Sequence, residues 1–300
     1  MDALSDVLQK IKLSSAVYFK SDFSSPWGMD VPTGPFAQFH IVTDGKCLLK
    51  TQEDVVELSA GDLVVFPRGT AHWLADSISS EKISGMKVVQ SITSGNSLFQ
   101  GESVSTTLVC GHFEFDRMVR HTLIDSLPEL IYITKSEIRE KEWLRSIVNL
   151  VIEESGANRQ GNKVVIKKLG EILFIHALRA YIEQNKIETG FLAALKDDRI
   201  SSSLKLIHTS PGENWTLESL ARNVGMSRTS LSNRFRDLVG ETPMSYLTNW
   251  RILNAKELLK ESDLSVREVA HKIGYQSETA FNRVFKDRVE MTPLKFRNSV

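Results

Sequence analysis

The chain has 300 residues, enough for two domains that each bury a core, and its 41% hydrophobic and 25% charged residues are ordinary for a globular protein. Because no run approaches 18 consecutive apolar residues and the N-terminus lacks the pattern of a signal peptide, neither a transmembrane helix nor secretion is expected. Two cysteines, Cys47 and Cys110, do not make a disulfide framework. A cytoplasmic location is therefore predicted.

The net charge of zero conceals an asymmetry between the two ends of the chain. Residues 197–300 carry 16 Lys and Arg against 13 Asp and Glu, whereas residues 1–196 carry 21 against 24. A basic excess of this size weakly favours nucleic-acid binding by the C-terminal part.

Short apolar stretches separated by turn signals fill the first hundred-odd residues. The turns are rich in Gly, Pro, Ser and Asp, as in VPTGP, SAGD and PRGT. The stretches read as strands over 36–42, 47–51, 62–66, 87–92 and 105–115. Short strands at this spacing predict an antiparallel β-barrel or sandwich over residues 1–125.

Helical periodicity begins after Asp125. Apolar residues recur at helix spacing from Trp143 to Val151, and a second helix is predicted over roughly 163–185. That second helix is apolar on most of its circumference, which is typical of a helix buried on several sides. It could be a core helix between domains or a dimer interface. Residues 126–198 are therefore predicted to be a helical linker that takes part in dimerisation.

A repeated pattern carries the strongest signal, and both copies lie within residues 199–300. The first copy is TLESLARNVGMSRTSLSNRFRDLVGETPMSYL and the second is SVREVAHKIGYQSETAFNRVFKDRVEMTPLKF. Each has an Ala inside a short helix, a Gly four residues later and then a Ser. Apolar residues follow the Ser by four and by eight positions. Each copy closes with a Thr-Pro pair, interpreted as a stop, and a long helix over roughly 244–260 is expected between the copies.

Every element of the repeat has a physical reason. Gly225 and Gly274 follow helix ends, where left-handed backbone is needed, and Ser227 and Ser277 can cap the next helix. This is the pattern of a helix-turn-helix, whose second helix presents its outer face to the DNA major groove. The side chains predicted to contact double-stranded DNA are Arg228, Thr229, Ser232, Asn233, Arg236, Glu278, Thr279, Asn282, Arg283 and Lys286.

Residues 199–297 resemble the DNA-binding domain of the AraC/XylS transcription regulators. The resemblance runs through WTLESLARNVGMSRTSLSNRFRDLVGETPMSYLTNWRI and AKELLKESDLSVREVAHKIGYQSETAFNRVFKDRVEMTPLKFR. It implies two helix-turn-helix units that enter successive major-groove segments, so that one chain reads an asymmetric site and a homodimer reads two.

The N-terminal part resembles the cupin-like barrels that many such regulators carry. GDLVVFPRGTAHWL (residues 61–74) has the spacing of the second cupin motif: Gly, five residues, Pro-x-Gly, two residues and His72. Catalytic cupins hold a metal with a Glu and two further histidines from the first motif. Here Gln38 stands where that Glu is expected, and the expected His-x-His region reads VPTGP. The resemblance therefore favours a regulator over a metal-dependent cupin enzyme.

A different metal site remains a hypothesis. His40 lies on the same strand face as Gln38, and Cys110 and His112 alternate along one strand. With His72 they form a nitrogen and sulfur ligand set that suits zinc, and Cys47 is a further candidate. The alternative is that each is an ordinary buried residue.

The barrel is predicted to hold a small-molecule effector. The candidate lining residues, each of which could instead be core, are Phe36, Gln38, His40, Phe66, His72 and Trp73, with Trp27 as a cover. The chain is thus predicted to be a bacterial, cytoplasmic transcription regulator with a sensor or dimerisation barrel (1–125), a helical linker (126–198) and a DNA-binding domain (199–300). The alternative within this class is an effector-free regulator whose barrel only dimerises.

Overall fold

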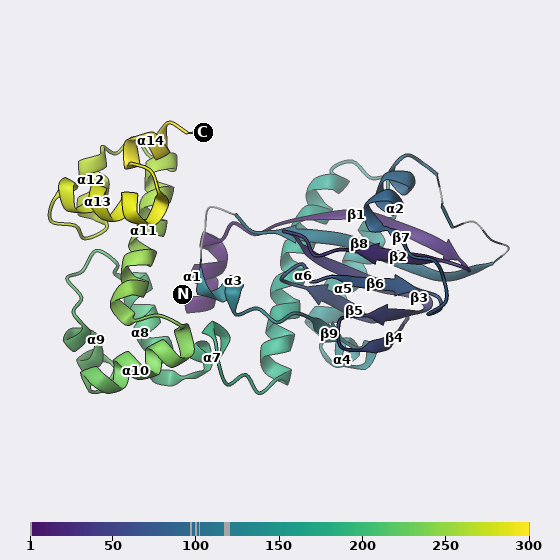
Figure 1. Ribbon diagram of the computed structural model, residues 1–300, viewed down its shortest axis with the longest axis horizontal. Coiled ribbons are helices and arrows are strands. Elements are labelled where there is room, and N and C mark those ends of the chain that lie inside the picture. Colours follow the sequence, from purple (N-terminus) through teal and green to yellow (C-terminus); the bar gives the residue numbers. More distant parts are fainter. Residues whose placement is uncertain (1, 97, 100, 102, 117–120, 300) are drawn as a thin grey trace. The chain divides into compact units, whose positions relative to one another are not determined.

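The structure is a computed structural model, shown in Figure 1, and it forms two compact units. It describes residues 2–96, 98, 99, 101, 103–116 and 121–299. The sheet unit comprises residues 12–117 and 127–186, and the helical unit comprises 1–11, 118–126 and 187–300. The chain therefore passes between the units four times, whereas the sequence analysis placed one boundary at 125 and another at 198.

A curled, largely antiparallel sheet forms the core of the sheet unit. Its strands are β1 (Ser14–Ser24), β2 (Gly28–Val31), β3 (Ala37–Lys50), β4 (Val55–Ser59), β5 (Leu63–Phe66), β6 (His72–Ala75), β7 (Ile83–Ser84), β8 (Val104–Glu114) and β9 (Ile131–Ile133). The order is β1-β8-β3-β6-β2-β7, with β4 and β5 also paired to β3 and β9 to β5. Only the short β2–β7 pair is parallel among the described strands. The predicted antiparallel β-rich part is confirmed.

One predicted strand is wrong. Residues 87–92 lie in helix α2 (Gly85–Thr93) and not in a strand. Val88, Val89 and Ile92 all pack against the core of the sheet unit. This three- to four-residue spacing is that of a helix face, which the β-branched composition of KVVQSI obscured.

The two faces of the sheet have different partners. Along β3, Gln38 and His40 point to the inside of the curl, and Phe39 and Ile41 point to the other face. Helices α5 (Glu142–Ser155) and α6 (Asn162–Gln184) follow the short helix α4 (Lys135–Glu140). The predicted helix over 163–185 is confirmed as α6. Figure 1 shows α6 running beside the sheet.

Helix α6 lies very close to β1. A Cβ atom on Gly170 would stand 2.2 Å from Ser15 Oγ, so only glycine fits there. The Ser15 hydroxyl donates to the carbonyl of Lys167 at 2.7 Å, and Phe174 packs on Phe113 with ring centroids 5.1 Å apart. The helical hairpin is thus an integral layer of the sheet unit.

Asp62 explains why GDLVVF begins with Gly-Asp. Gly61 has a φ of +100°, which allows the sharp turn into β5. The buried Asp62 carboxylate accepts from the backbone N–H of Ser59 at 2.9 Å, from that of Lys135 at 2.7 Å and from the hydroxyl of Tyr132 at 3.0 Å. It therefore ties the turn before β5 to the segment that leads into α4. Burial, followed by the bond to Asp62, raises the pKa of Tyr132 to about 12.

The helical unit contains both copies of the repeat. Its helices are α1 (Ala3–Lys10), α3 (Thr122–Asp125), α7 (Phe191–Lys196), α8 (Asp198–Thr209), α9 (Leu217–Asn223), α10 (Arg228–Val239), α11 (Pro243–Glu261), α12 (Val266–Lys272), α13 (Glu278–Val289) and α14 (Pro293–Arg297). The first repeat is α9–α10, the second is α12–α13, and α11 joins them. The predicted long helix is confirmed.

The interpretation of the two Thr-Pro pairs as stops is wrong. Thr242 accepts from the N–H of Ser245 at 3.3 Å and caps α11, with Pro243 as its first residue. Thr292 and Pro293 begin α14 in the same way. Proline lacks an N–H that would be unpaired at this position, so it favours a helix start as much as a stop.

The turns of both repeats have the predicted geometry. Gly225 and Gly274 have φ values of +66° and +90°. Ser227 accepts from the N–H of Ser230 at 3.1 Å and caps α10, and Ser277 caps α13 through the N–H of Ala280 at 3.2 Å. The residues four and eight positions after each serine are fully buried; these are Leu231, Phe235, Phe281 and Phe285.

A buried chain of hydrogen bonds joins three distant segments of the helical unit. The N–H of Leu123 donates to His121 Nδ1 at 3.0 Å, so the proton of the neutral imidazole lies on Nε2, which donates to Tyr246 Oη at 3.0 Å. The tyrosine hydroxyl then donates to His208 Nε2 at 2.7 Å, and His208 Nδ1 lies 3.3 Å from the carboxylate of Asp6. Helix α1 and the segment of α3 are therefore fastened to α8 and α11.

Candidate functional site

Helices α10 and α13 present the predicted DNA-contacting residues on the surface. Eight of the ten are exposed, and Ser232 and Asn282 are half-buried. The nearby Arg234 pairs with Asp197 at 2.9 Å. Among the ion pairs between described residues, none involves the cationic side chains of this set, which are Arg228, Arg236, Arg283 and Lys286. Their charges are available for phosphates or guanine edges.

Arg251 of α11 fastens the second helix-turn-helix to the loop before the first, a role that sequence reasoning missed. Its guanidinium donates to the carbonyls of Pro211 and Glu213, both at 2.7 Å, and lies over the ring of Tyr275 at 5.7 Å. Tyr275 directly follows the turn glycine Gly274. A DNA site with two parts requires a fixed spacing between the two recognition helices, and the contacts of Arg251 contribute to holding that spacing.

The sheet unit contains a cavity of about 430 Å³ inside the curl. Its walls are apolar on most sides, and the strands of the sheet contribute the polar groups of Tyr18, Gln38, His40, Ser84 and Cys110. The lining residues are Tyr18, Phe19, Met29, Val31, Pro32, Thr33, Gly34, Pro35, Phe36, Gln38, His40, Ser84, Gly85, Met86, Val89 and Cys110. No Lys, Arg, Asp or Glu is among them. The volume and the apolar walls are typical of a small-molecule site.

Three of the six residues predicted to line an effector pocket do line this cavity: Phe36, Gln38 and His40. Phe66 and His72 are buried beside it and stack on each other at 3.7 Å. Trp73 lies on the opposite face of β6 from His72, with the Lys82 ammonium 4.5 Å from its ring centroid.

The predicted cover, Trp27, lies elsewhere. Its ring packs on Phe23 at 4.9 Å, and its indole N–H donates to Ser105 at 3.2 Å. It is therefore a core residue of the sheet unit.

Cys110, His40 and His72 form a directed chain of hydrogen bonds at the cavity wall. His72 Nδ1 donates to the carbonyl of Thr70 at 2.8 Å, so the Nε2 of the neutral ring is an acceptor. His40 Nε2 donates to it at 2.9 Å, which leaves His40 Nδ1 to accept from the Cys110 thiol at 3.0 Å. The register of β3 and β8 sets His40 directly opposite Cys110. The proton on sulfur therefore points at a basic nitrogen.

Burial keeps all three groups neutral. It lowers the pKa of His40 well below its usual value, with the neighbouring His72 as a second cause, and lowers the pKa of His72 to about 4. It also raises the pKa of the Cys110 thiol well above its usual value. The cavity and its polar wall thus carry no charge near pH 7.

The structure does not bring the four predicted zinc ligands around one point. His112 Nε2 lies 2.9 Å from Glu114, and its ring stacks on Tyr18. In the part of the chain that the structure describes, no group of three or more His, Cys, Asp or Glu side chains is arranged to hold a metal ion. Zinc stays a prediction, which metal analysis of the purified protein would test.

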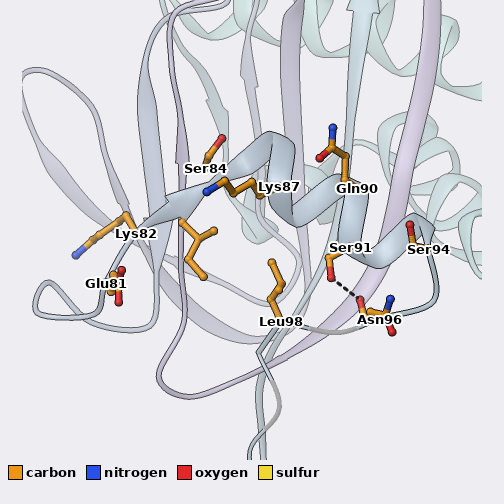
Figure 2. Close-up of a pocket in the computed structure, with 10 residues that line it drawn as sticks. Glu81, Lys82, Ser84, Lys87, Gln90, Ser91, Ser94, Asn96 and Leu98 are labelled. Atoms are coloured by element: carbon orange, nitrogen blue, oxygen red, sulfur yellow. Dashed lines mark hydrogen bonds between the residues drawn. The ribbon is translucent and has the colours of Figure 1, made fainter.

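A second hollow, of about 670 Å³, lies along the outside of α2 (Figure 2). Lys87, Gln90, Ser91 and Ser94 follow the helix along this groove, and the Ser91 hydroxyl donates to the carbonyl of Asn96 at 3.1 Å. The groove is open to solvent, so it offers a small molecule less enclosure than the inner cavity.

Comparison with known proteins matches both units. The family described as cupin matches residues 2–183, and the family described as a helix-turn-helix domain matches residues 220–299. The HTH-type transcriptional regulator AlkR of Acinetobacter baylyi is 31% identical over 304 residues, covering 99% of each chain. The RCS-specific HTH-type transcriptional activator RclR of Escherichia coli is 27% identical over 304 residues, covering 100% of this chain and 98% of its own.

Two further matches are a relative along the whole chain and a solved DNA-binding domain. A protein of Streptomyces antibioticus that bears the name of an AraC-like transcription regulator is 28% identical over 300 residues, covering 99% of this chain and 98% of its own. The solved DNA-binding domain of AdpA, in complex with a target DNA, is 32% identical, with a TM-score of 0.34 over 34% of this chain and 93% of that chain.

A curled cupin sheet joined to paired helix-turn-helix units defines a DNA-binding transcription regulator, and relatives that match along the whole chain are transcription regulators and not enzymes. The chain belongs to the AraC family of transcription regulators, in the group with an N-terminal cupin domain. The predicted family and fold class are confirmed, and so is the predicted role as a DNA-binding transcription regulator. None of the described helices is long and apolar enough to cross a membrane.

Proposed function

We propose that this regulator binds a small, neutral, largely apolar molecule in the sheet-unit cavity and that this ligand controls its binding to bacterial promoters in the cytoplasm. The observation that carries the proposal is the cavity of about 430 Å³ without a charged lining residue. A carboxylate or ammonium would lose its hydration there without a counter-ion, whereas an apolar molecule gains from burial. A ligand that prefers one arrangement of the protein shifts the population able to bind DNA.

Ligand screening tests the effector proposal. Neutral aromatic and aliphatic compounds are paired with their carboxylate counterparts, such as toluene with benzoate, and thermal unfolding is measured. At a hundredfold excess over Kd, a bound neutral compound should stabilise the protein by about 2.7 kcal/mol and its carboxylate should not. Val89→Trp should fill the cavity and abolish the effect, and Ile78→Trp, at an exposed position outside the lining, is the control. If the neutral compound stabilises both variants equally, the ligand binds outside this cavity.

We infer that Arg283 reads a base or a phosphate. Its side chain is exposed on the outer face of α13, at the sixth of the 12 residues of this helix. Arg283→Ala should weaken specific DNA binding by about 1–3 kcal/mol if a base edge is contacted. Footprinting titrations of a promoter site measure the loss.

Arg68→Ala is the matched control, because it removes the same charge from an exposed position between β5 and β6 in the sheet unit. Binding of the unaltered protein should also fall steeply with added salt. Equal affinities of the two arginine variants would rule out the proposed role of Arg283.

We propose that a second copy of the chain covers the outer surface of α5 and α6. Leu150 on α5 and Val164, Val165 and Ile172 on α6 are exposed apolar side chains, and Val164 is 67% exposed. Exposed apolar side chains on neighbouring helices are typical of a protein–protein interface. The helix that the sequence marked as either core or dimer interface would then be both.

Charge reversal of the apolar surface tests dimerisation. Val165→Glu combined with Ile172→Glu should convert a dimer into a monomer in sedimentation equilibrium, and should lower the affinity for a paired DNA site by about a hundredfold or more through loss of avidity. Ile78→Glu places the same charge at an exposed apolar position outside these helices. A dimer that survives the double substitution would exclude this surface.

A further inference from the structure

The hydrogen-bond chain at the cavity wall resembles the arrangement that activates a nucleophile. A nucleophilic side chain lies within hydrogen-bond distance of a base, and a third group orients that base. Here the groups are the Cys110 thiol, His40 at 3.0 Å, and His72, which accepts from His40 at 2.9 Å. Phe66 stacks on His72, and the carbonyl of Thr70 fixes its tautomer. A cysteine needed only for packing has no use for a directed base.

The position of the thiol adds a second, independent observation. Cys110 and His40 both line the cavity, so a molecule inside it meets the sulfur and the base together. Cys47 is a natural comparison. It is also buried, with a pKa raised to about 12 by burial and by Asp62 and Glu57, but it does not line the cavity.

We propose that Cys110 is a covalent attachment site for neutral electrophiles with a carbon–carbon double bond conjugated to a carbonyl, such as enones, quinones and maleimides. This inference rests on the proposed effector cavity and names the chemical class of its ligand.

The addition balances without any further reactant. The S–H bond breaks as the sulfur forms a bond to the β-carbon of the conjugated system, and the electron pair of the double bond moves toward the carbonyl. His40 Nδ1 takes the thiol proton and returns it to the α-carbon or to the carbonyl oxygen of the ligand. The product is a neutral thioether, and nothing is oxidised or reduced.

The charge-free wall selects the electrophile. A resting thiol that stays protonated reacts slowly with polar reagents from solution, since the thiolate is the stronger nucleophile. A neutral molecule that partitions into the apolar cavity is held beside the sulfur and the base, so proton transfer and bond formation occur together. The reacting groups are neutral before and after the addition, as a cavity without charged residues requires.

Labelling of the folded, full-length protein tests the proposal. The protein is treated with N-ethylmaleimide, which is neutral, or with 3-maleimidopropanoate, which has the same reactive group and a negative charge. Peptide mass spectrometry then gives the rate at each cysteine. We expect Cys110 to react with N-ethylmaleimide at least tenfold faster than Cys47, and at least tenfold faster than it reacts with the anionic reagent. In urea the two cysteines should react alike.

His40→Gln tests the role of the base, because glutamine is polar but cannot take up the proton. Its Cys110 labelling rate should fall by about a hundredfold, in the range that general bases contribute. Gln90→Glu, on the outer groove away from the cavity, should leave the rate unchanged. Circular dichroism and the unchanged rate at Cys47 show that the His40 variant is folded.

Three outcomes would overturn the inference: equal rates at the two cysteines in the folded protein, no effect of His40→Gln, or equal rates with the two maleimides. Cys110→Ser separates this inference from the effector proposal. If this variant still gains stability from neutral ligands such as toluene while the unaltered protein shows no selective labelling, the effector cavity stands and covalent attachment fails. If neutral ligands fail to bind either protein, the effector proposal fails as well.

Discussion

Phe285→Ala is expected to lower the free energy of unfolding of the helical unit by about 3–5 kcal/mol, as removal of a buried phenylalanine ring does in other cores. Phe285 is fully buried, with its ring between Phe281 at 5.4 Å and Phe296 at 5.6 Å. These rings join α13 to α14 and form the core of the second helix-turn-helix. A loss of this size is a large fraction of the stability of a typical domain, so specific DNA binding should be lost as well.

Urea denaturation followed by circular dichroism measures the effect. Leu294→Ala is the matched control, because Leu294 lies on the neighbouring helix α14 but is 59% exposed. Its cost should stay within about 0.5 kcal/mol. Comparable losses for both variants would mean that the aromatic core of the second repeat does not support the unit.

Acidification from pH 7.5 to pH 5 is expected to destabilise the helical unit by as much as ~4 kcal/mol. Burial lowers the pKa of His121 to about 3, and burial with the neighbouring charges of His121 and Lys10 lowers that of His208 to about 3. In the unfolded chain the pKa of each histidine returns to about 6.5. Between pH 6.5 and pH 3 the unfolded state therefore binds more protons than the folded state. Stability therefore falls as the pH falls through this window, by about 2 kcal/mol for each histidine at pH 5.

His208→Gln tests this assignment, since glutamine can still meet Tyr246 but does not titrate in this range. The variant should lose about half of the pH dependence, measured as the midpoint of urea unfolding between pH 7.5 and pH 5. His271→Gln, on the exposed surface of α12, should keep the full dependence. An unaltered slope in His208→Gln would show that the acid sensitivity arises elsewhere.

Local patterns predicted the helical unit well because its rules act over a few residues. The turn glycines, the capping serines and the buried positions four and eight residues later depend on helix geometry alone, and all were confirmed. The Thr-Pro pairs were misread because a cap and a helix end share the same residue types. Arg251 was missed because its acceptors are carbonyls about 40 residues away, and carbonyls have no sequence signature.

The sheet-unit site was predicted in part. Alternation along β3 and β8 placed His40 and Cys110 on faces that pairing could bring together, and the register does set them opposite each other. The same alternation places the adjacent residues His72 and Trp73 on opposite faces of β6, but both were assigned to the pocket because they were taken together from one motif. The direction of the hydrogen bonds from Cys110 to His72 could be assigned only from the structure. It follows from the tautomers of the two histidines, which are fixed by the last acceptor of the chain, the carbonyl of Thr70.

The hydrogen-bond chain through Tyr246 has a consequence for how the protein is made on the ribosome. Asp6 and His208 are 202 residues apart, and the ion pair between Lys10 and Glu257 spans 247 residues. The sheet unit is thus an insertion in the sequence of the helical unit, and its residues are all synthesised before those of α8 and α11. Helix α1 can dock only after its partners, which are translated last, have been synthesised. Contacts of such long sequence separation form slowly. The helical unit, which binds DNA, therefore completes its fold only after the whole sheet unit has been synthesised.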